Sequence, residues 1–296
     1  MTDTPILYES AGEGIAKITL NRPETRNAQD TTMLYALNDA FDRAAHDDSI
    51  KVVILAANGP HFSSGHDLRE TGPMRTMADH EPVGSWGGYS GAGHEAMHAR
   101  EKEIYFGLSE RWRNFAKPTI AQVQGKCISG GLMLVWPCDI IIAADNASFQ
   151  DNTIVMGIPG VEWFANPYEF GPRKAKELLF TADAISAQEA HGLGMVNHVV
   201  AESDLAAFTL ALAERIAQKS SYALKLAKEA VNNAVDAQGR TTVMSAQLAL
   251  HQVAHAHATM RYGMPIDPTG LDPRLGLGVP DDAPDLSSMP PVKSGG

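Results

Sequence analysis

The sequence predicts an α/β fold, and two strand–helix–strand units of similar layout lead to this prediction. Each unit combines a short apolar strand, a helix with one apolar face and a second strand, the order typical of a sheet covered by helices. The units are residues 15–20, 31–45 and 51–56, and residues 119–123, 130–135 and 139–143. A mostly parallel sheet with helical crossovers is therefore the expected core.

The elements of the first unit follow from hydrophobic periodicity. Ile15–Leu20 alternates apolar and polar residues, as a strand does, and Pro23 in the turn after it cannot donate to a sheet. Thr31 or Thr32 is the expected N-cap of the next helix, in which apolar residues recur on one face. After its first residue, Lys51–Ala56 is continuously apolar, which is typical of a strand covered on both faces.

The second half of the chain is mainly helical by pattern. Pro172 suits the first turn of a helix that runs through Phe180, and Ser186 with Glu189 forms a capping-box pattern for a shorter helix. Beyond Met264 the chain is rich in Pro, Gly and Asp, which predicts a tail without a core of its own. A strand is expected over residues 195–200, and helices over residues 205–219, 223–234 and 241–258.

The segment between the two units has no clear secondary-structure pattern. Residues 71–93 are rich in Gly, Pro, Ser and Met, and a polar helix follows over about residues 94–114. A structureless stretch of this length inside a compact domain is usually a functional loop, so we expect a lid here.

Composition and charge narrow the classes of function. The 296 residues carry 24 Lys and Arg against 35 Asp and Glu, a formal net charge of −11, and such a field repels nucleic acid and anionic lipid. The longest apolar run, around residues 140–144, is too short to cross a bilayer, and no export signal is visible. Cys127 and Cys138 lie in apolar stretches, which favours buried thiols in a reducing cytoplasm. We expect a cytoplasmic protein that binds neither nucleic acid nor a membrane.

Two histidine clusters raise the question of a metal site. Residues 94–98 read His-Glu-Ala-Met-His, a pattern in which two histidines hold zinc and the glutamate is the general base of a hydrolase. Their surroundings predict a solvated helix, and no third ligand stands at a familiar spacing. His251, His255 and His257 form a second cluster, but no acidic ligand is near them in the sequence. A zinc hydrolase is the least favoured function, and we expect no bound metal.

Two glycine-containing turns are the stronger functional signal. Ser63–Leu68 and Gly125–Gly131 each follow a predicted strand and open a helix, where backbone N–H groups are free to bind an anion. Glycine permits close approach of the backbone to a ligand, so two such turns can direct two N–H groups at one oxygen. The alternative is that these glycines serve tight turns and helix packing.

Short motifs occur in a fixed order along about residues 6–234. They are Asn21–Ala28, Phe62–Leu68, Lys117–Gly125 running into Ser129–Gly131, Cys138–Asp139, Phe149, Gly157–Gly160, Phe180–Ala182, Ala187–Ala190 and Leu193–Val196. In order and spacing the set resembles the enoyl-CoA hydratase/isomerase, or crotonase, superfamily. Each motif is weak alone, but the joint pattern is highly specific.

The resemblance implies a crotonase-like spiral of ββα turns over residues 1–200 and a helical region over 201–262 that builds trimers or dimers of trimers. Residues 263–296 remain as the tail. It also implies acyl-CoA substrates, with coenzyme A as part of the substrate and no separate cofactor. The family's shared step forms an enolate whose oxyanion is held by two backbone N–H groups, here those of His66 and Gly130. The His66 imidazole has no required role in this scheme.

The same resemblance places further residues at the acyl-CoA site. Arg22 and Arg26 lie in the segment that approaches the coenzyme A nucleotide in relatives, although solvated surface arginines are an equal alternative. The other expected substrate-binding positions are Ser64, Gly65, Asp67, Leu68, Gly131, Met133, Thr153 and Trp163.

The sequence departs from the family's hydratases at their acid/base positions. Those enzymes carry one glutamate just after the Gly-Gly pair and a second about twenty residues later. Met133 stands at the first position and Thr153 or Asn152 at the second, and none of the three has a carboxyl group. A two-glutamate hydratase is therefore disfavoured.

The catalytic role then passes to other carboxylates. Glu162 follows the turn near the substrate α-carbon in relatives, and Trp163 and Phe164 are expected to raise its pKa towards a useful range. Asp151 is the weaker candidate. Two more residues are unranked candidates for lining the site: Tyr168 and Glu169. The expected function is an acyl-CoA isomerase or lyase with an altered acid/base layout, and the alternative is a non-catalytic acyl-CoA binding protein.

Overall fold

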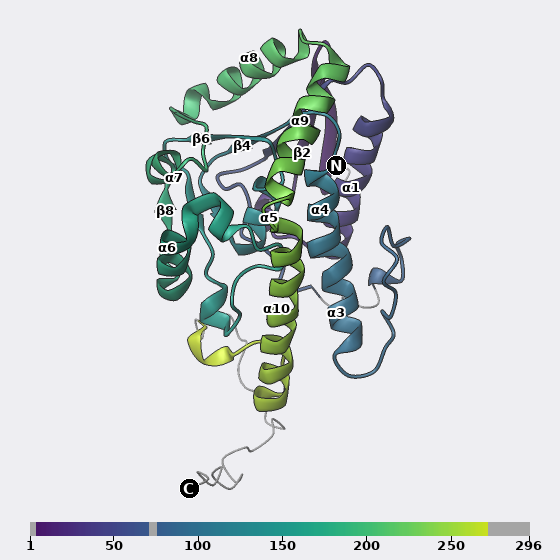
Figure 1. Cartoon of the computed structure of the whole chain (residues 1–296), viewed down its shortest axis with the longest axis vertical. Helices are drawn as coiled ribbons and strands as arrows, with labels where there is room; N and C mark the ends of the chain where they lie inside the picture. The colour runs from purple at the N-terminus through teal and green to yellow at the C-terminus, as the bar shows by residue number, and fades with distance from the viewer. Residues whose placement is uncertain (1–3, 71–75, 272–296) are drawn as a thin grey trace, which may run out of the picture.

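The predicted α/β fold class is confirmed. The computed structural model describes residues 4–70 and 76–271, in which a six-stranded and a three-stranded sheet are surrounded by helices (Figure 1). The strands gather in the upper half of the view, and α10 runs along the long axis towards the C-terminal end.

The larger sheet has the strand order β1-β2-β3-β4-β6-β9. β1 and β2 are antiparallel, whereas each later pair in this sheet is parallel. Parallel neighbours need crossovers over the faces of the sheet, and helices supply them. The strands are β1 (Ile6–Gly12), β2 (Ile15–Leu20), β3 (Val52–Ala57), β4 (Thr119–Val123), β6 (Ile140–Ala144) and β9 (His198–Val200).

Both faces of the larger sheet are buried. On one face, Ile15 and Ile54 belong to an apolar cluster with Leu205 of α8 (Leu205–Ala217). The other face belongs to the main core, which includes the apolar side of α1 (Thr31–His46). Successive side chains of a strand point to opposite faces, so β3 is buried at each of its positions, as its continuous apolar run predicts.

A smaller sheet carries the second glycine turn. β5 (Lys126–Ile128) pairs in parallel with β7 (Ser148–Gln150), which pairs antiparallel with β8 (Ile185–Ser186). β5 leads through the 3-10 turn η3 (Ser129–Gly131) into α5 (Leu132–Val135). Strands of two or three residues give no periodic signal, so the sequence does not predict this sheet.

The polar helix predicted over residues 94–114 contains a π-helical segment. α3 (Glu95–Glu101) continues through η2 (Lys102–Gly107) into α4 (Leu108–Arg113). Such segments are rare and frequently occur at functional sites. Glu101 and Tyr105 are both buried, so this interruption brings polar side chains into the interior.

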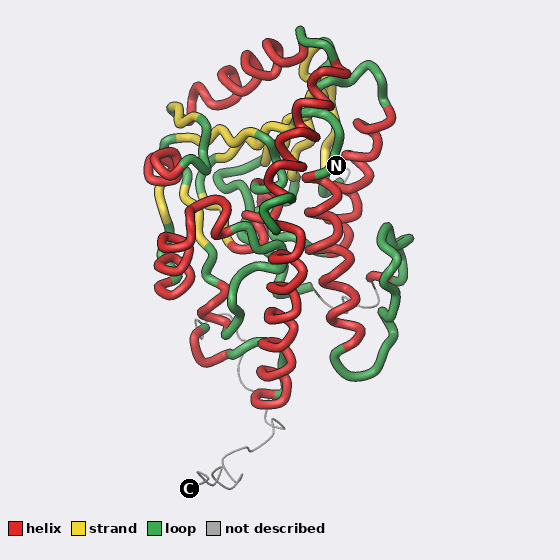
Figure 2. The backbone as a smooth tube through the Cα atoms, viewed as in Figure 1, coloured by secondary structure: helices red, strands yellow, loops and turns green. Residues whose placement is uncertain are grey.

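The C-terminal helices form a column next to α3 and α4, drawn as red coils in Figure 2. α9 (Ser221–Asp236) is followed by α10 (Arg240–Tyr262), which buries His251 and His255 on its inner side. Its outer side exposes Leu250, Val253 and Met260. An exposed apolar stripe of this kind is typical of an interaction surface.

Several predicted helix boundaries are confirmed and one is wrong. α6 (Asn166–Thr181) breaks at Gly171, so Pro172 begins a helical stretch as predicted. Ser186 caps α7 (Ala187–Leu193). The N-cap of α1 is Asp30, whose carboxylate accepts the N–H of Met33, rather than Thr31 or Thr32. The remaining short turns are η1 (Pro23–Thr25), η4 (Thr153–Met156), η5 (Glu202–Asp204) and η6 (Pro268–Gly270).

The first part of the predicted tail is packed on the body. The Asp267 N–H donates to the carbonyl of Met156 at 2.9 Å, and Tyr262 donates to the Asp267 carboxylate at 3.0 Å. A ring nitrogen of His255 donates to the carbonyl of Pro265. Residues 265–271 thus pack on the body of the protein, while the prediction of a tail without a core of its own stays a prediction and residues 272–296 lie outside the described part.

The predicted lid falls partly outside the described residues, which resume at position 76. The described part of this segment contacts the π-helical segment, where the Glu103 carboxylate accepts the N–H groups of Val83 and Gly84. Across residues 4–70 and 76–271, no helix combines the length and apolar character needed to cross a membrane. The boundary between residues 1–200 and 201–262 stays a prediction.

Candidate active site

The two glycine turns lie side by side. Ser63 and Cys127 form a parallel bridge, in which Ser63 donates to the carbonyl of Lys126 at 3.2 Å and Ile128 donates to that of Ser63 at 3.0 Å. This pairing joins segments that are about sixty residues apart in sequence, and it brings the loop ending at Leu68 next to η3. The two turns thus form one backbone surface.

Each turn has a left-handed residue directly before the predicted oxyanion donor. Gly65, before His66, has φ 93°, and Ser129, before Gly130, has φ 45°. A non-glycine residue in this region is strained, and such strain is found disproportionately at functional sites. A bond of 2.6 Å from the Ser129 hydroxyl to the Asn152 side-chain oxygen helps to hold the conformation.

Close approach explains the glycines themselves. A Cβ atom at Gly65 would lie 2.9 Å from the carbonyl oxygen of Ile128, and one at Gly131 would lie 2.9 Å from that of Ser63. Both contacts are with backbone, which cannot move aside as a flexible side chain does. The turns therefore need glycine for packing, which was the alternative to a role in ligand binding. The same close packing brings the backbones of the two turns together.

A buried polar scaffold supports the first turn. Gln29 donates to the Ser63 hydroxyl at 3.1 Å, and that hydroxyl donates to the carbonyl of Asn27 at 2.8 Å and accepts the Gly65 N–H at 3.2 Å. Gln29 and Ser63 are fully buried. Gly130 is the second residue of η3, where a backbone N–H has no partner within the helix, and among the described loops and turns no backbone carbonyl accepts the His66 N–H.

The His66 imidazole lies inside the site. Its Nε2 is 3.1 Å from Oε2 of Glu162, and its ring stacks on Tyr105 with a centroid distance of 3.7 Å. A Cβ atom at Gly130 would lie 2.6 Å from the ring's Nδ1. Within the described part of the chain, this buried Nδ1 has no hydrogen-bond partner. No motif in the sequence indicates a role for this ring.

Glu162 is buried, but the predicted rise in its pKa is wrong. Burial by itself raises the pKa of this carboxyl, and the neighbouring His66 and His251 outweigh it and hold the pKa well below its usual range. Glu162 is therefore the ionised partner of a histidine. The flanking Trp163 does not face it, since its indole N–H donates to Glu110 at 2.8 Å.

Asp151 holds the backbone next to Glu162. Its carboxylate accepts the Thr153 hydroxyl at 2.7 Å, the Val161 N–H at 3.3 Å and the Asn166 amide at 3.1 Å. These bonds occupy both oxygens and fix the turn that presents Glu162. The structure thus places Asp151 as a support for that turn, and its predicted catalytic role stays untested.

The two positions that carry glutamates in hydratases lie in the interior. Met133 and Thr153 are buried, and the Thr153 hydroxyl is engaged by Asp151. Glu162 contacts the first glycine turn, because its carboxylate bonds the side chain of His66.

The predicted nucleotide-binding arginines differ in their surroundings. Arg22 is half-buried and forms ion pairs of 3.0 Å with Asp30 and Asp67, so it connects η1 to the first turn. Arg26 is exposed, and among the described residues no ion pair engages its guanidinium. Its carbonyl accepts the N–H of Ser64 at 3.0 Å. Arg26 is therefore an exposed cation next to the first turn, as is Arg69, which follows the exposed Leu68.

Two cavities of the described structure lie away from His66 and Gly130. One of about 660 Å³ is lined by Trp163, Tyr168 and Glu169, and by residues of α9. Burial raises the pKa of Glu169 to about 8. The other, of about 440 Å³, lies between the segment after Val83 and the helix that carries Lys102. Trp163, Tyr168 and Glu169 are thus brought together, but not with the oxyanion turns.

The histidine motif predicted as a possible zinc site is not assembled. His94 donates to the side-chain oxygen of Gln252 at 2.9 Å, whereas His98 lies against Trp86. His251 and His255 have no acidic residue near them in the sequence, but the fold brings Glu101 of α3 into contact with both. A residue 150 positions away in sequence gives no local signal, so only tertiary packing reveals it.

Comparisons with known proteins agree with this fold. The chain matches the enoyl-CoA hydratase/isomerase family model over residues 10–85 and 87–266. It is 46% identical over 257 residues to the Mycobacterium tuberculosis protein EchA13, named as an enoyl-CoA hydratase, covering 85% of this chain and 81% of that one. It is 35% identical over 221 residues to human enoyl-CoA hydratase domain-containing protein 3, covering 73% and 66%.

Solved structures give the same result. A Mycobacterium smegmatis protein described as an enoyl-CoA hydratase has a TM-score of 0.80 at 46% identity, covering 88% of this chain and 98% of its own. An enoyl-CoA hydratase/isomerase from Xanthobacter autotrophicus Py2 has a TM-score of 0.72 at 32% identity, covering 88% and 94%. With a family model over most of its length and relatives of this similarity, the chain belongs to the enoyl-CoA hydratase/isomerase family.

Proposed function

We propose that this chain is an enzyme acting on acyl-CoA thioesters through an enolate that its two glycine turns stabilise. The thioester oxygen accepts the backbone N–H groups of His66 and Gly130. Donors that are fixed before the reaction stabilise developing negative charge without reorganisation, which is a large contribution to catalysis. The available N–H groups and the strained residue at Ser129 support this assignment.

The observation that carries the proposal is the contact of His66 with Glu162, 3.1 Å long, beside Gly130. The Nε2–H of a neutral His66 donates to the ionised Glu162, which leaves a lone pair on Nδ1. A carboxylate that orients a histidine in this way fixes its tautomer and stabilises the imidazolium that forms later. This pair replaces the two glutamates of the family's hydratases.

The proposed step is a proton transfer within one pocket. Nδ1 of His66 takes a proton from the carbon next to the thioester carbonyl, and the electrons of the broken C–H bond move onto the thioester oxygen. The imidazolium then returns the proton, either to the same carbon or, where the acyl group has a β,γ double bond and the enolate is a dienolate, to the γ-carbon. The second outcome moves a double bond and is an isomerisation.

Substrate anchoring and assembly complete the proposal. Arg26 meets the phosphates of coenzyme A, since it is an exposed cation next to the first turn and charge-assisted bonds to phosphate are strong. The exposed apolar stripe on α10 supports the expected trimer.

Exchange of the α-proton in deuterated water tests the mechanism. The wild-type protein is incubated with a panel of saturated and unsaturated acyl-CoA esters, and deuterium uptake is followed by NMR. His66→Gln should lose at least about a hundred-fold in exchange, the usual scale for a positioned acid/base group, and should retain binding because its backbone N–H remains. The exposed His257→Gln is the matched control. Binding without exchange by the wild type would instead indicate an acyl-CoA binding protein.

A further inference from the structure

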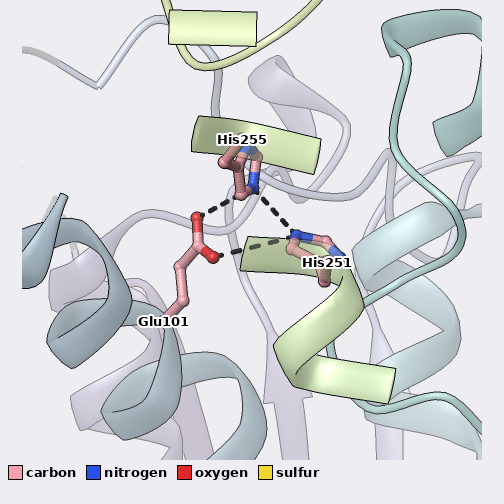
Figure 3. A group of neighbouring side chains, drawn as sticks. All are labelled: Glu101, His251 and His255. Carbon is pink, nitrogen blue, oxygen red and sulfur yellow. Dashed lines mark hydrogen bonds and ion pairs between the residues drawn. The ribbon is translucent and has the colours of Figure 1, made fainter. Parts of the chain in front are cut away.

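Three side chains from distant parts of the sequence meet behind the proposed catalytic pair. α10 contributes His251 and His255, one turn apart, and the last residue of α3 contributes Glu101 (Figure 3). Nε2 of His255 is 2.9 Å from Nε2 of His251 and 3.2 Å from Oε1 of Glu101. Oε2 of Glu101 is 3.8 Å from Nε2 of His251. All three residues are buried.

The outer nitrogens of both rings are committed to backbone carbonyls. Nδ1 of His251 lies 2.8 Å from the carbonyl oxygen of Gly160, and Nδ1 of His255 bonds that of Pro265. A carbonyl can only accept, so each Nδ1 carries the hydrogen. A neutral imidazole then has a lone pair on Nε2. Two lone pairs and a carboxylate therefore face one another, and either a proton or a metal ion must lie between them.

We propose that Glu101, His251 and His255 bind a first-row divalent transition-metal ion, with zinc as the preferred occupant. Imidazole and carboxylate are ligands that zinc takes at about 2.0–2.2 Å, so tetrahedral ligand atoms stand roughly 3.3 Å apart. The two ring nitrogens are 2.9 Å apart, and the nearest Glu101 oxygens lie 3.2 Å (Oε1) from His255 and 3.8 Å (Oε2) from His251. One ligand atom from each of the three residues lies within 4.8 Å of the other two, so a small shift of the Glu101 carboxylate completes the set. Calcium and magnesium prefer oxygen ligands throughout, which disfavours them here. The inference replaces the expectation that no metal is bound.

The residues around the cluster supply the outer shell that a metal site needs. Metal-binding histidines commonly donate their second ring N–H to a carbonyl, and ligating carboxylates are themselves hydrogen-bonded. Here Gln252 donates to Oε2 of Glu101 at 2.6 Å and accepts from His94 at 2.9 Å. Each proposed ligand is thus fixed by a second residue.

Charge balance points the same way. Glu101 and Glu162 are both buried, and Oε1 of Glu162 is 3.7 Å from Nε2 of His251. Across residues 4–70 and 76–271, their ion-pair partners are histidines and include no Lys or Arg. Two buried carboxylates need compensating charge, and a divalent ion supplies it without protonating the rings. Three protein ligands also leave a coordination position for water.

Metal binding by the untagged protein tests the site. The protein is dialysed against a chelator and titrated with Zn²⁺ by calorimetry, and separately with Co²⁺ while the visible spectrum is recorded. We expect one equivalent per chain and the d–d absorption of tetrahedral Co²⁺. Glu101→Gln and His255→Gln should each weaken zinc binding by at least about a hundred-fold, since even outer-shell changes cost ten- to a hundred-fold.

Matched controls separate this cluster from other histidines. His257→Gln removes an exposed histidine two residues from His255 on the same helix, and His98→Gln removes one from the His-Glu-Ala-Met-His motif. Both should bind zinc as the wild type does. Circular dichroism checks that each variant is folded. The Co²⁺ spectrum of the wild type tests the site without any substitution, so it does not depend on the folding of a variant.

Two results would overturn the proposal. One is a wild-type protein that binds neither ion at stoichiometric concentration, which would mean that a shared proton fills the cluster. The other is zinc binding that survives both Glu101→Gln and His255→Gln but is lost in His98→Gln. Because the proposed catalytic step uses neither Glu101 nor His255, the α-proton exchange test can fail or succeed independently.

Discussion

Nε2 of His66 lies 3.1 Å from Oε2 of Glu162, and the backbone of the same histidine follows the left-handed Gly65 in the first glycine turn. In the proposed mechanism, one residue thus presents a donor to the thioester oxygen and a ring to the carbon beside it. The His66 ring is held by Glu162 and also by the π-helical segment, whose Tyr105 stacks on the imidazole. Tyr105 in turn accepts a hydrogen bond from Arg100 at 3.2 Å.

Replacing Glu162 by glutamine should separate orientation from charge. The amide oxygen can still accept from His66, but the negative charge that stabilises an imidazolium is gone. We expect α-proton exchange to fall by about a hundred-fold or more while affinity for a non-reactive acyl-CoA analogue stays within a few-fold by calorimetry. Exchange at the wild-type rate would remove Glu162 from the mechanism. The exposed Glu95→Gln is the control.

Two glycine-to-alanine changes should have opposite effects. At Gly130 the new methyl group would lie 2.6 Å from the His66 ring, so Gly130→Ala should displace the imidazole and abolish exchange. At Gly192, inside α7, nothing lies within 4 Å of the new atom, and Gly192→Ala should stabilise the fold by roughly 0.5–1 kcal/mol. Exchange rates and chemical denaturation measure the two outcomes. Equal activity of the two variants would contradict the placement of Gly130.

Glu169 should make stability fall as the pH rises. Its carboxyl has a pKa raised by burial to about 8 in the folded chain, against an ordinary 4.5. Between these values the folded state holds a proton that the unfolded state has lost, so the unfolding free energy decreases with pH by at most about 1.4 kcal/mol per unit. The side chain is partly exposed, which reduces the slope.

Glu169→Gln removes this titration. The variant should therefore be more stable than the wild type at pH 8 and similar to it at pH 4.5, as measured by denaturation at each pH. A stability difference independent of pH would show that packing around residue 169, and not its ionisation, is responsible.

Truncation should distinguish the two parts of the C-terminal segment. A chain ending at Met264 loses the bonds that Pro265 and Asp267 make with His255 and Tyr262, whereas a chain ending at Leu271 keeps them. Each buried hydrogen bond contributes about 1 kcal/mol, so the shorter chain should have a lower Tm. Equal Tm values for the two chains would mean that residues 265–271 contribute nothing to the fold.

Assembly should depend on the outer side of α10. Leu250 and Val253 are 61% and 66% exposed in the isolated chain, and burying them between subunits is favourable. Light scattering at micromolar concentration should give a trimer or its dimer for the wild type and smaller species for Val253→Glu. A monomeric wild type would refute the expected assembly.

The larger sheet and the long helices were predictable because their apolar residues recur with a clear period. Ile15–Leu20 is a strand with the predicted bounds, and the helix expected from Thr31 begins there, although its cap is Asp30. Asp30 was overlooked because two threonines beside it are also good caps. By contrast β8 has two residues, too few for any period.

The candidate site was predictable as backbone but not as side chains. Motif spacing located His66 and Gly130, whose role depends on main-chain N–H groups. Spacing carries no information about where a ring points, so the contact between His66 and Glu162, and the pKa of Glu162 that follows from it, could not be inferred. Glu101 was hidden for the same reason, since its partners lie on α10.

The meeting of α3 and α10 has a consequence for the order of events during synthesis. Gln252, the donor to Glu101, follows it by 151 residues, and contacts so distant along the chain are slow to form because their loop must close first. While the ribosome is still making α9, the partners of Glu101 on α10, which are His251, Gln252 and His255, do not yet exist. The Glu101 carboxylate is then more stable in water than in the interior. The interior behind the active site is thus completed only when the last long helix has left the exit tunnel, and a prematurely ended chain would expose this defect to cellular proteases.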